Sequence, residues 1–221
     1  MYGSSSTFAS PVLAKVALLL SFLCFSVASQ ALSHSELNMN GIASYWSLSS
    51  EIYAAALYME EPHDTEDGIL YAPGLKRMEM RVVADKWRER SFAKIWTQAI
   101  IINNDKEIQQ ALVKEIAEFT RMPKGPFLYG DKITIDYTPG DGTRVKVNDT
   151  ELLHIENELF FNALLRTWIG ARPPSTEFKD YILKLDESDL VVSDLLGFYD
   201  HIEPDLQVKR YKETAAWKYI P

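Results

Sequence analysis

Alternation of apolar and polar residues predicts β-strands in this chain. Met78, Met80 and Val82 alternate with charged residues in the segment 76–85, which is typical of a strand with one buried face. The segment 42–49 alternates in part and predicts another strand. Between residues 131 and 155, two runs flank the turn sequence PGDG, and a second turn sequence, NDT, follows. This segment is therefore expected to form a β-hairpin.

Apolar residues recur at three- and four-residue spacing elsewhere, which predicts amphipathic helices. These are expected over residues 85–104, 105–122, 157–170 and 173–183. Asp85 and Asp105 are placed to cap the first two helices. Gly170 ends the third, and Ser175 or Thr176 caps the fourth. This order of elements indicates the α+β class, with an antiparallel β-sheet backed by a layer of α-helices.

The residue pattern does not decide the secondary structure of two segments. The segment 50–59, SEIYAAALYM, contains three consecutive alanines, which favour a helix, but it has no capping signal on either side. Its aromatic and apolar residues are equally compatible with a strand. The tail from residue 184 to residue 221 has mixed charge and weak periodicity, and no element is assigned to it.

The first 31 residues have the layout of a secretory signal peptide. Lys15 precedes an apolar run over residues 16–28, and small residues follow the run. The run is short for a membrane span, which takes about 20 residues. Cleavage is expected near Ala31, so we expect a periplasmic or secreted protein without stable membrane insertion after cleavage. An uncleaved N-terminal anchor is the alternative.

Composition excludes several kinds of site. Cys24 is the only cysteine and lies in the expected signal peptide, so the mature chain can form no disulfide and has no cysteine nucleophile. The formal net charge of −8 argues against a nucleic-acid partner and against an anionic membrane surface. The four histidines lack the spacing of metal ligands, and no serine lies in a nucleophile motif, so neither a metal, a cofactor nor a catalytic residue is assigned.

Four strings carry a resemblance to a known family. They are IYAAALYM, KRMEMRVVADKW, GDKITIDYTPGDGTRVKVND and FFNALLRTWIGARPPSTEFKDYIL. Their order and spacing resemble the exported bacterial branch of the chalcone isomerase-like family. The resemblance implies an open-faced sandwich of one antiparallel sheet and a helical layer, with a ligand cleft between them. It divides the chain into a signal peptide (1–31), a chalcone isomerase-like domain (32–185) and a C-terminal extension (186–221).

The resemblance implies that residues 51–59 form a strand. Alanine packs less surface in a strand than valine does. Ala54 and Ala56 therefore indicate either the close approach of a helix or a cavity above the sheet. Close packing under the helix that carries Phe92 or Trp96 is the favoured interpretation.

The family includes isomerases that close a chalcone to a flavanone and non-enzymatic members that bind fatty acids. The resemblance implies that both use a strand arginine against an oxyanion, because a buried oxyanion requires a fixed cation. Tyr45 stands where that arginine is expected, and no lysine or arginine lies between Leu32 and Leu75. A tyrosine donates a hydrogen bond but supplies no charge. Arg77 and Arg81 alternate away from the apolar face and are expected to point to solvent.

These considerations predict a non-catalytic protein that binds a small apolar or amphipathic, fatty-acid-like ligand in the cleft. The candidate ligand-binding residues are Tyr45, Trp46, Tyr53, Tyr58 and Trp96. Tyr45 would orient a ligand oxygen, and the other aromatic rings would supply contact area. One alternative is an intramolecular lyase or isomerase that acts on a chalcone-like or other enone substrate, which requires a cation in the cleft. A second alternative is an envelope interaction protein with a filled cleft, whose extension docks to a protein partner.

Overall fold

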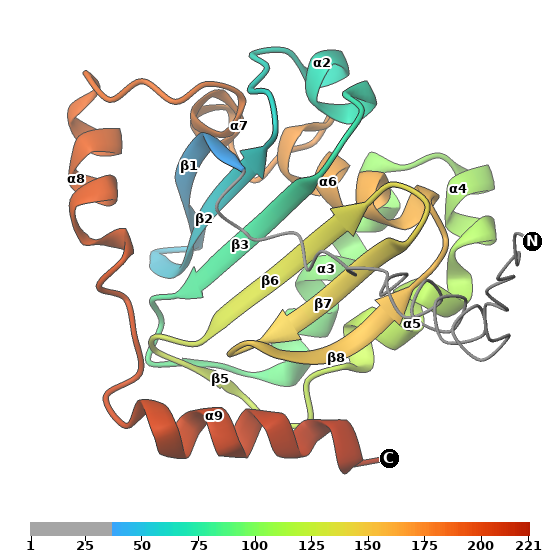
Figure 1. Cartoon of the computed structure of the whole chain (residues 1–221), viewed down its shortest axis with the longest axis vertical. Coiled ribbons are helices and arrows are strands. Elements are labelled where there is room, and N and C mark those ends of the chain that lie inside the picture. Colours follow the sequence, from blue (N-terminus) through green and yellow to red (C-terminus); the bar gives the residue numbers. More distant parts are fainter. Residues whose placement is uncertain (1–36) are drawn as a thin grey trace, which may run out of the picture. The chain divides into compact units, whose positions relative to one another are not determined.

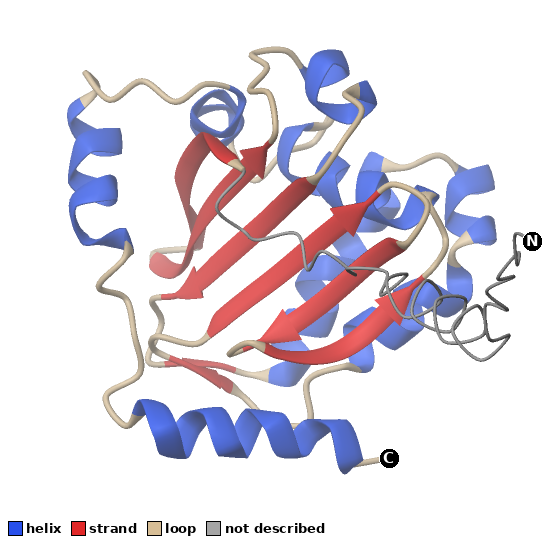
Figure 2. Cartoon of the chain, viewed as in Figure 1, coloured by secondary structure: helices blue, strands red, loops and turns tan. Residues whose placement is uncertain are grey.

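A six-stranded antiparallel sheet is the centre of the fold (Figures 1 and 2). The computed structural model describes residues 37–221, so the predicted signal peptide lies outside the described residues. In spatial order the strands are β1 (Asn38–Ser47), β2 (Ser50–Met59), β3 (Lys76–Val82), β6 (Lys132–Thr138), β7 (Gly142–Val147) and β8 (Thr150–Ile155). Two short strands, β4 (Lys86–Trp87) and β5 (Phe127–Leu128), form a separate pair.

Helices pack against one face of the sheet and enclose the main core with it (Figure 1). The helices that contribute to this core are α2 (Glu66–Tyr71), α3 (Glu89–Asn103), α4 (Lys106–Ala111), α5 (Val113–Arg121), α6 (Leu159–Ile169) and α7 (Thr176–Leu183). The C-terminal extension adds α8 (Leu190–Tyr199), α9 (Gln207–Ala215) and the 3₁₀ helix η2 (Ala216–Tyr219). The predicted α+β class and the antiparallel sheet backed by helices are confirmed. Among residues 37–221, the structure contains no helix with the length and apolar character of a membrane span.

The strand predictions follow the burial pattern closely. Met78, Met80 and Val82 are fully buried on the helical side of β3. The predicted hairpin forms β6 and β7, and the NDT turn leads into β8. Asn148 and Asp149 adopt positive φ angles of 49° and 65°, which are typical of the tight turns that connect antiparallel strands.

The helix predictions needed three corrections. Asp85 does not cap α3, because residues 86–87 first pair with β5 and α3 begins at Glu89 with Arg88 at the N-cap. The predicted helix 105–122 is broken at Leu112 into α4 and α5. Asp105 does cap α4 through the Ile108 N–H, at 2.9 Å.

Ser175, one of two alternatives, caps α7 through the Phe178 N–H at 3.0 Å. Gly170 is the C-cap of α6, as predicted. The third correction concerns the start of α6: it begins at Leu159, and Asn157 precedes the helix and accepts a hydrogen bond from the Leu159 N–H at 3.2 Å.

The alanine-rich segment is strand β2, and its alanines pack on both faces. Ala55 lies in the core that the sheet forms with the helical layer. Ala54 and Ala56 lie in a second apolar cluster with α8. The expectation that Ala54 and Ala56 pack under Phe92 or Trp96 is therefore wrong, because successive side chains of a strand point to opposite faces.

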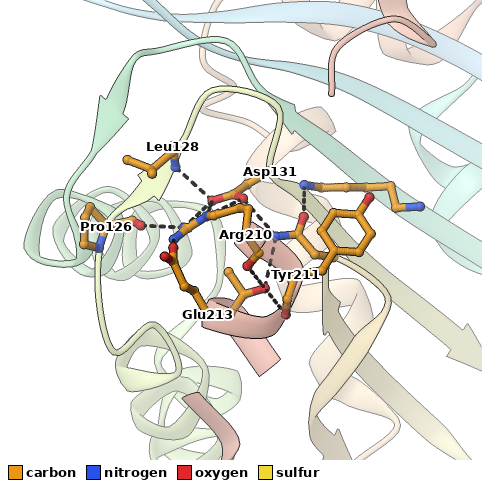
Figure 3. A network of polar contacts seen from close by, with 9 residues as sticks. Pro126, Leu128, Asp131, Arg210, Tyr211 and Glu213 are labelled. Carbon is orange, nitrogen blue, oxygen red and sulfur yellow. Dashed lines mark hydrogen bonds and ion pairs between the residues drawn. The ribbon is translucent and has the colours of Figure 1, made fainter. Parts of the chain in front are cut away.

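The C-terminal extension packs against the sheet through both of its long helices. Val192, Leu195 and Tyr199 of α8 cover the outer face of β1 and β2. The chain then passes so close to Gly130 (φ 82°) that a Cβ there would lie 2.1 Å from the carbonyl carbon of Glu203. Arg210 of α9 reaches a polar network around Asp131 (Figure 3). Residues 37–221 therefore form one compact unit that includes the extension.

Arg77 and Arg81 lie on the outer face of β3, but neither points freely to solvent. Arg77 forms an ion pair with Asp136, and its side chain is only 10% exposed. Arg81 Nη1 donates to the Tyr199 carbonyl at 3.1 Å, and its guanidinium lies 4.6 Å from the centre of the Tyr199 ring. The expected solvent exposure is wrong because Arg77 pairs with Asp136 of β6, and Tyr199 at the end of α8 covers Arg81.

Candidate functional site

A cleft of about 450 Å³ opens between the β1–β2 strand pair, α3 and the C-terminal end of α6. Tyr45 and Tyr53 line it from the strands, Trp96 from α3 and Trp168 from α6. Its volume is within the range of small-molecule sites, about 300–1,000 Å³. The side chains of the protein therefore do not fill the space between the sheet and the helices at this end of the sheet.

The aromatic wall of the cleft is a continuous stack. Tyr45 and Tyr53 are direct partners across the β1–β2 pair, and their rings are 4.7 Å apart and nearly parallel, at 7°. Tyr53 also stacks on Trp168, with ring centres 6.5 Å apart, and Phe178 meets the Tyr45 ring edge-on at 6.5 Å. Such contacts hold the wall in place. Tyr53, Trp168 and Phe178 are themselves buried, so Tyr45 is the ring of this stack that a ligand can reach.

The two tyrosine hydroxyls of the wall stay protonated at neutral pH. Tyr53 is fully buried, and this burial raises the pKa of its hydroxyl far above the usual value. Burial also raises the pKa of the partly exposed Tyr45 hydroxyl. Tyr45 can therefore donate a hydrogen bond to a ligand oxygen, but it supplies neither a charge nor a base.

Positive charge at the cleft comes from Lys94 of α3 and Arg172 of the loop after α6. Both side chains are exposed, and within residues 37–221 neither forms an ion pair. Asn103 fixes the backbone of Arg172, accepting its N–H at 2.8 Å and donating to its carbonyl at 2.9 Å. Two cations thus line an aromatic cleft, which suits an anionic group attached to an apolar body.

Sequence reasoning missed both of these cations. Lys94 and Gln98 are four residues apart, so they lie on the same face of a helix. This spacing is the one local feature of the sequence that could have indicated a polar group at the cleft. Arg172 follows the end of α6, and its position depends on Asn103, which is 69 residues away in the chain. No local pattern reveals such a contact.

Three of the five predicted residues line the cleft, namely Tyr45, Tyr53 and Trp96. Trp46 does not line it and is 56% exposed, next to an irregularity in the β1–β2 register between Tyr45 and Trp46. Tyr58 packs with the α8 cluster on the opposite face. Tyr53 and Tyr58 are five residues apart in one strand, an odd spacing that directs their side chains to opposite faces.

The side chains that line the cleft are better suited to binding a ligand than to transferring a proton. Among the described residues that line the cleft there is no Asp, Glu, His or Cys. The polar side-chain groups are hydroxyls, one amide, two indole N–H groups and the two cations. Across residues 37–221, no three His, Cys, Asp or Glu side chains gather in a way that could hold a metal ion. The arrangement can bind an anionic amphipathic molecule through aromatic contact area and charge.

The fold has a relative among solved structures. A crystal structure of a fatty-acid binding protein from Arabidopsis thaliana superposes with a TM-score of 0.54 and 14% sequence identity, covering 67% of this chain and 87% of that chain. At this identity the likeness shows the fold. No curated protein sequence matches this one significantly.

The sequence itself identifies the family. The family model described as chalcone isomerase-like matches residues 26–184, which is well over half of the 221 residues. The match includes β1 to α7 and therefore every element that lines the cleft. This chain belongs to the chalcone isomerase-like family.

Proposed function

We propose that this protein binds an anionic amphipathic ligand, such as a fatty acid, in the cleft and does not convert it chemically. The observation that carries this proposal is the position of Lys94 and Arg172 beside a stacked aromatic wall. The ligand's carboxylate would pair with the two cations, and its chain would lie against Tyr45 and the exposed Ile102. The fatty-acid binding protein that shares the fold supports this choice of ligand class.

The charge comes from different elements than the resemblance implied. Tyr45 stands at the expected arginine position and stacks on Tyr53, so it extends the apolar wall. Lys94 of α3 and Arg172 of the loop after α6 then take the role of the missing cation. Because both cations are exposed, water screens them, and we expect moderate affinity for the carboxylate.

We also propose that the protein belongs to the exported bacterial branch of the family and acts in the periplasm or outside the cell. The signal-peptide layout of residues 1–31 supports this proposal. Comparing the mass of the protein from whole cells with that from the exported fraction tests it. A mature chain that begins near residue 32 is expected, whereas an intact N-terminus in the exported fraction would contradict cleavage.

Native mass spectrometry of the exported protein, purified without detergent, tests the binding proposal. The expected result is an added mass that is released on unfolding and identified as a fatty acid or a related anionic lipid. The isomerase alternative predicts instead that the protein speeds the loss of the enone absorbance of an added chalcone. A protein that binds no added fatty acid, at any concentration below the onset of micelles, would contradict the binding proposal.

A further inference from the structure

A second groove, of about 470 Å³, is formed by α5, β8 and η2 and shares no lining residue with the cleft. Its floor is apolar: Leu152 and Leu153 come from β8, and the largely buried Trp217 comes from η2. Trp217 is held by an edge-on contact with Phe127 at 5.3 Å and by the guanidinium of Arg210 at 5.6 Å. These contacts fix η2 at the rim of the groove.

Positive charge surrounds this apolar floor. Four cations line the groove, Lys114, Arg121, Lys124 and Lys218, against one carboxylate, Glu118. Glu118 lies 3.8 Å from Lys114, and their side chains are 44% and 82% exposed. Within residues 37–221, Arg121 and Lys218 form no ion pair. The groove is therefore a cationic site on a protein whose net charge is −8.

Exposed apolar side chains stand beside these cations. Ile220 lines the groove and is 46% exposed, and its neighbour Tyr219 is 83% exposed. Aromatic and aliphatic side chains next to lysines are the usual means by which a protein holds the interface of a lipid bilayer. A small soluble anion would make no apolar contact with these two exposed side chains, whereas a lipid interface would.

We propose that this groove is a docking site for the surface of a bilayer that contains anionic phospholipids. The headgroup phosphates would lie against Arg121 and Lys218, and Tyr219 and Ile220 would enter the headgroup region. This surface is separate from the ligand cleft, so the docking proposal does not depend on the proposed function and is tested separately.

The net charge of the whole sequence argues against binding to an anionic membrane. The charge at the groove itself is positive, however, and most of the acidic residues lie elsewhere. The acidic segment around α8 packs on β1, whereas the groove lies at β8, and these strands are the two opposite edges of the sheet. Five strand spacings separate them, about 24 Å. Salt at 0.1 M screens charges beyond about 10 Å, so the local cations dominate at the membrane.

Sedimentation with vesicles of phosphatidylcholine, with or without 30% phosphatidylglycerol, tests the proposal on the mature chain. The wild-type protein is expected to bind only the vesicles that contain phosphatidylglycerol. The double variant Arg121→Glu and Lys218→Glu is expected to bind at least about 30-fold more weakly, since each cation near an anionic surface contributes a factor of about five. The variant Tyr219→Ser and Ile220→Ser, which changes no charge, should also weaken binding.

The matched control is Lys86→Glu with Arg90→Glu, which changes the net charge by the same amount at two exposed positions outside the groove. It should keep most of the vesicle binding. Three results would overturn the proposal: no binding to anionic vesicles at low salt, equal losses in the two charge-reversal variants, or complete displacement by millimolar inorganic phosphate at constant ionic strength. The last result would assign the groove to a free anion. Thermal unfolding of each variant confirms that it is folded.

Discussion

Arg210 and Asp131 form a buried, two-point ion pair that joins α9 to the turn before β6 (Figure 3). Arg210 Nε donates to Asp131 Oδ1 at 2.8 Å, and its Nη2 donates to Oδ2 at 2.5 Å. The Leu128 N–H and Asn148 Nδ2 donate to the same carboxylate, each at 2.8 Å. The C-terminal extension is therefore bound to the sheet by a polar contact inside the protein, in addition to its apolar packing.

Removing the Arg210 side chain should destabilise the protein strongly. We expect Arg210→Ala to lower the free energy of unfolding by about 3–5 kcal/mol, because the fully buried carboxylate of Asp131 loses its counter-ion. Urea unfolding of the mature chain measures this change. Lys209→Ala is the control, since the Lys209 side chain is 72% exposed, and it should change stability by less than about 0.5 kcal/mol. Equal effects of the two variants would contradict the role of the ion pair.

The alanines on the outer face of β2 should not tolerate larger side chains. Ala54 is fully buried against the α8 cluster. We expect Ala54→Leu to cost about 1–3 kcal/mol of unfolding free energy and to speed cleavage within residues 186–221 in limited proteolysis, because α8 must move outward. Ala171→Leu, at an exposed loop position, is the control. An Ala54→Leu protein with unchanged stability and cleavage would show that α8 does not pack there.

The buried Lys76 should give stability a distinctive pH dependence. Lys76 is 2% exposed, donates to the Leu70 carbonyl at 3.0 Å and has a pKa that burial lowers to about 8. The unfolded chain keeps this proton up to a pH of about 10.4. Between these two values the unfolded state binds more protons, so stability rises with pH.

We expect this rise to amount to about 1–2 kcal/mol between pH 7.5 and 9.5, and to be absent in Lys76→Met. Urea unfolding at several pH values within this window measures it; the upper limit stays below the titration of the tyrosines. Lys86→Met, at an exposed position, is the control and should keep the wild-type slope. A slope in Lys76→Met equal to that of the wild type would contradict the assignment to Lys76.

The hydroxyl of Tyr45 should contribute to ligand affinity, and that of Tyr58 should not. Tyr45→Phe keeps the ring that stacks on Tyr53 but removes the donor, so affinity for a fatty acid should fall about fivefold. Tyr58→Phe is the matched control on the opposite face of the sheet. Titration calorimetry with palmitate measures both affinities. A larger loss for Tyr58→Phe than for Tyr45→Phe would place the ligand on the wrong face for this proposal.

The sheet could be predicted from the sequence because its signal is local. Alternation at Met78, Met80 and Val82 identified the buried face of β3, and the turn sequences defined β6, β7 and β8. The helix predictions were less accurate at the ends. The pairing of residues 86–87 with Phe127–Leu128, which delays the start of α3, joins segments about 40 residues apart, so no local pattern indicates it.

The extension could not be predicted for two physical reasons. In α8 the exposed Leu190 and Val191 stand beside the buried Val192 and Leu195, so apolar residues surround the helix and the periodic signal is lost. In α9 the contact that decides its position joins Arg210 to a residue 79 positions earlier. A network of this kind depends on the finished fold.

The candidate site was predictable only in part. The aromatic residues Tyr45, Tyr53 and Trp96 could be identified from their strings, and strict alternation along β2 would have excluded Tyr58. Lys94 and Arg172 come from elements that the resemblance did not connect with the expected arginine. Their proximity to the cleft depends on how α3 packs on α6 and on the long-range contact of Asn103.

The most direct test of the binding proposal compares two ligands of equal chain length, palmitate and hexadecanol, on two proteins. The wild-type chain is expected to prefer palmitate by up to about 30-fold, since two exposed cations each contribute up to about 1 kcal/mol. The double variant Lys94→Gln and Arg172→Gln should lose this preference while keeping its affinity for hexadecanol. Lys106→Gln with Lys209→Gln, at exposed positions that do not line the cleft, should keep the preference. A palmitate preference that survives in Lys94→Gln with Arg172→Gln would contradict carboxylate recognition in this cleft.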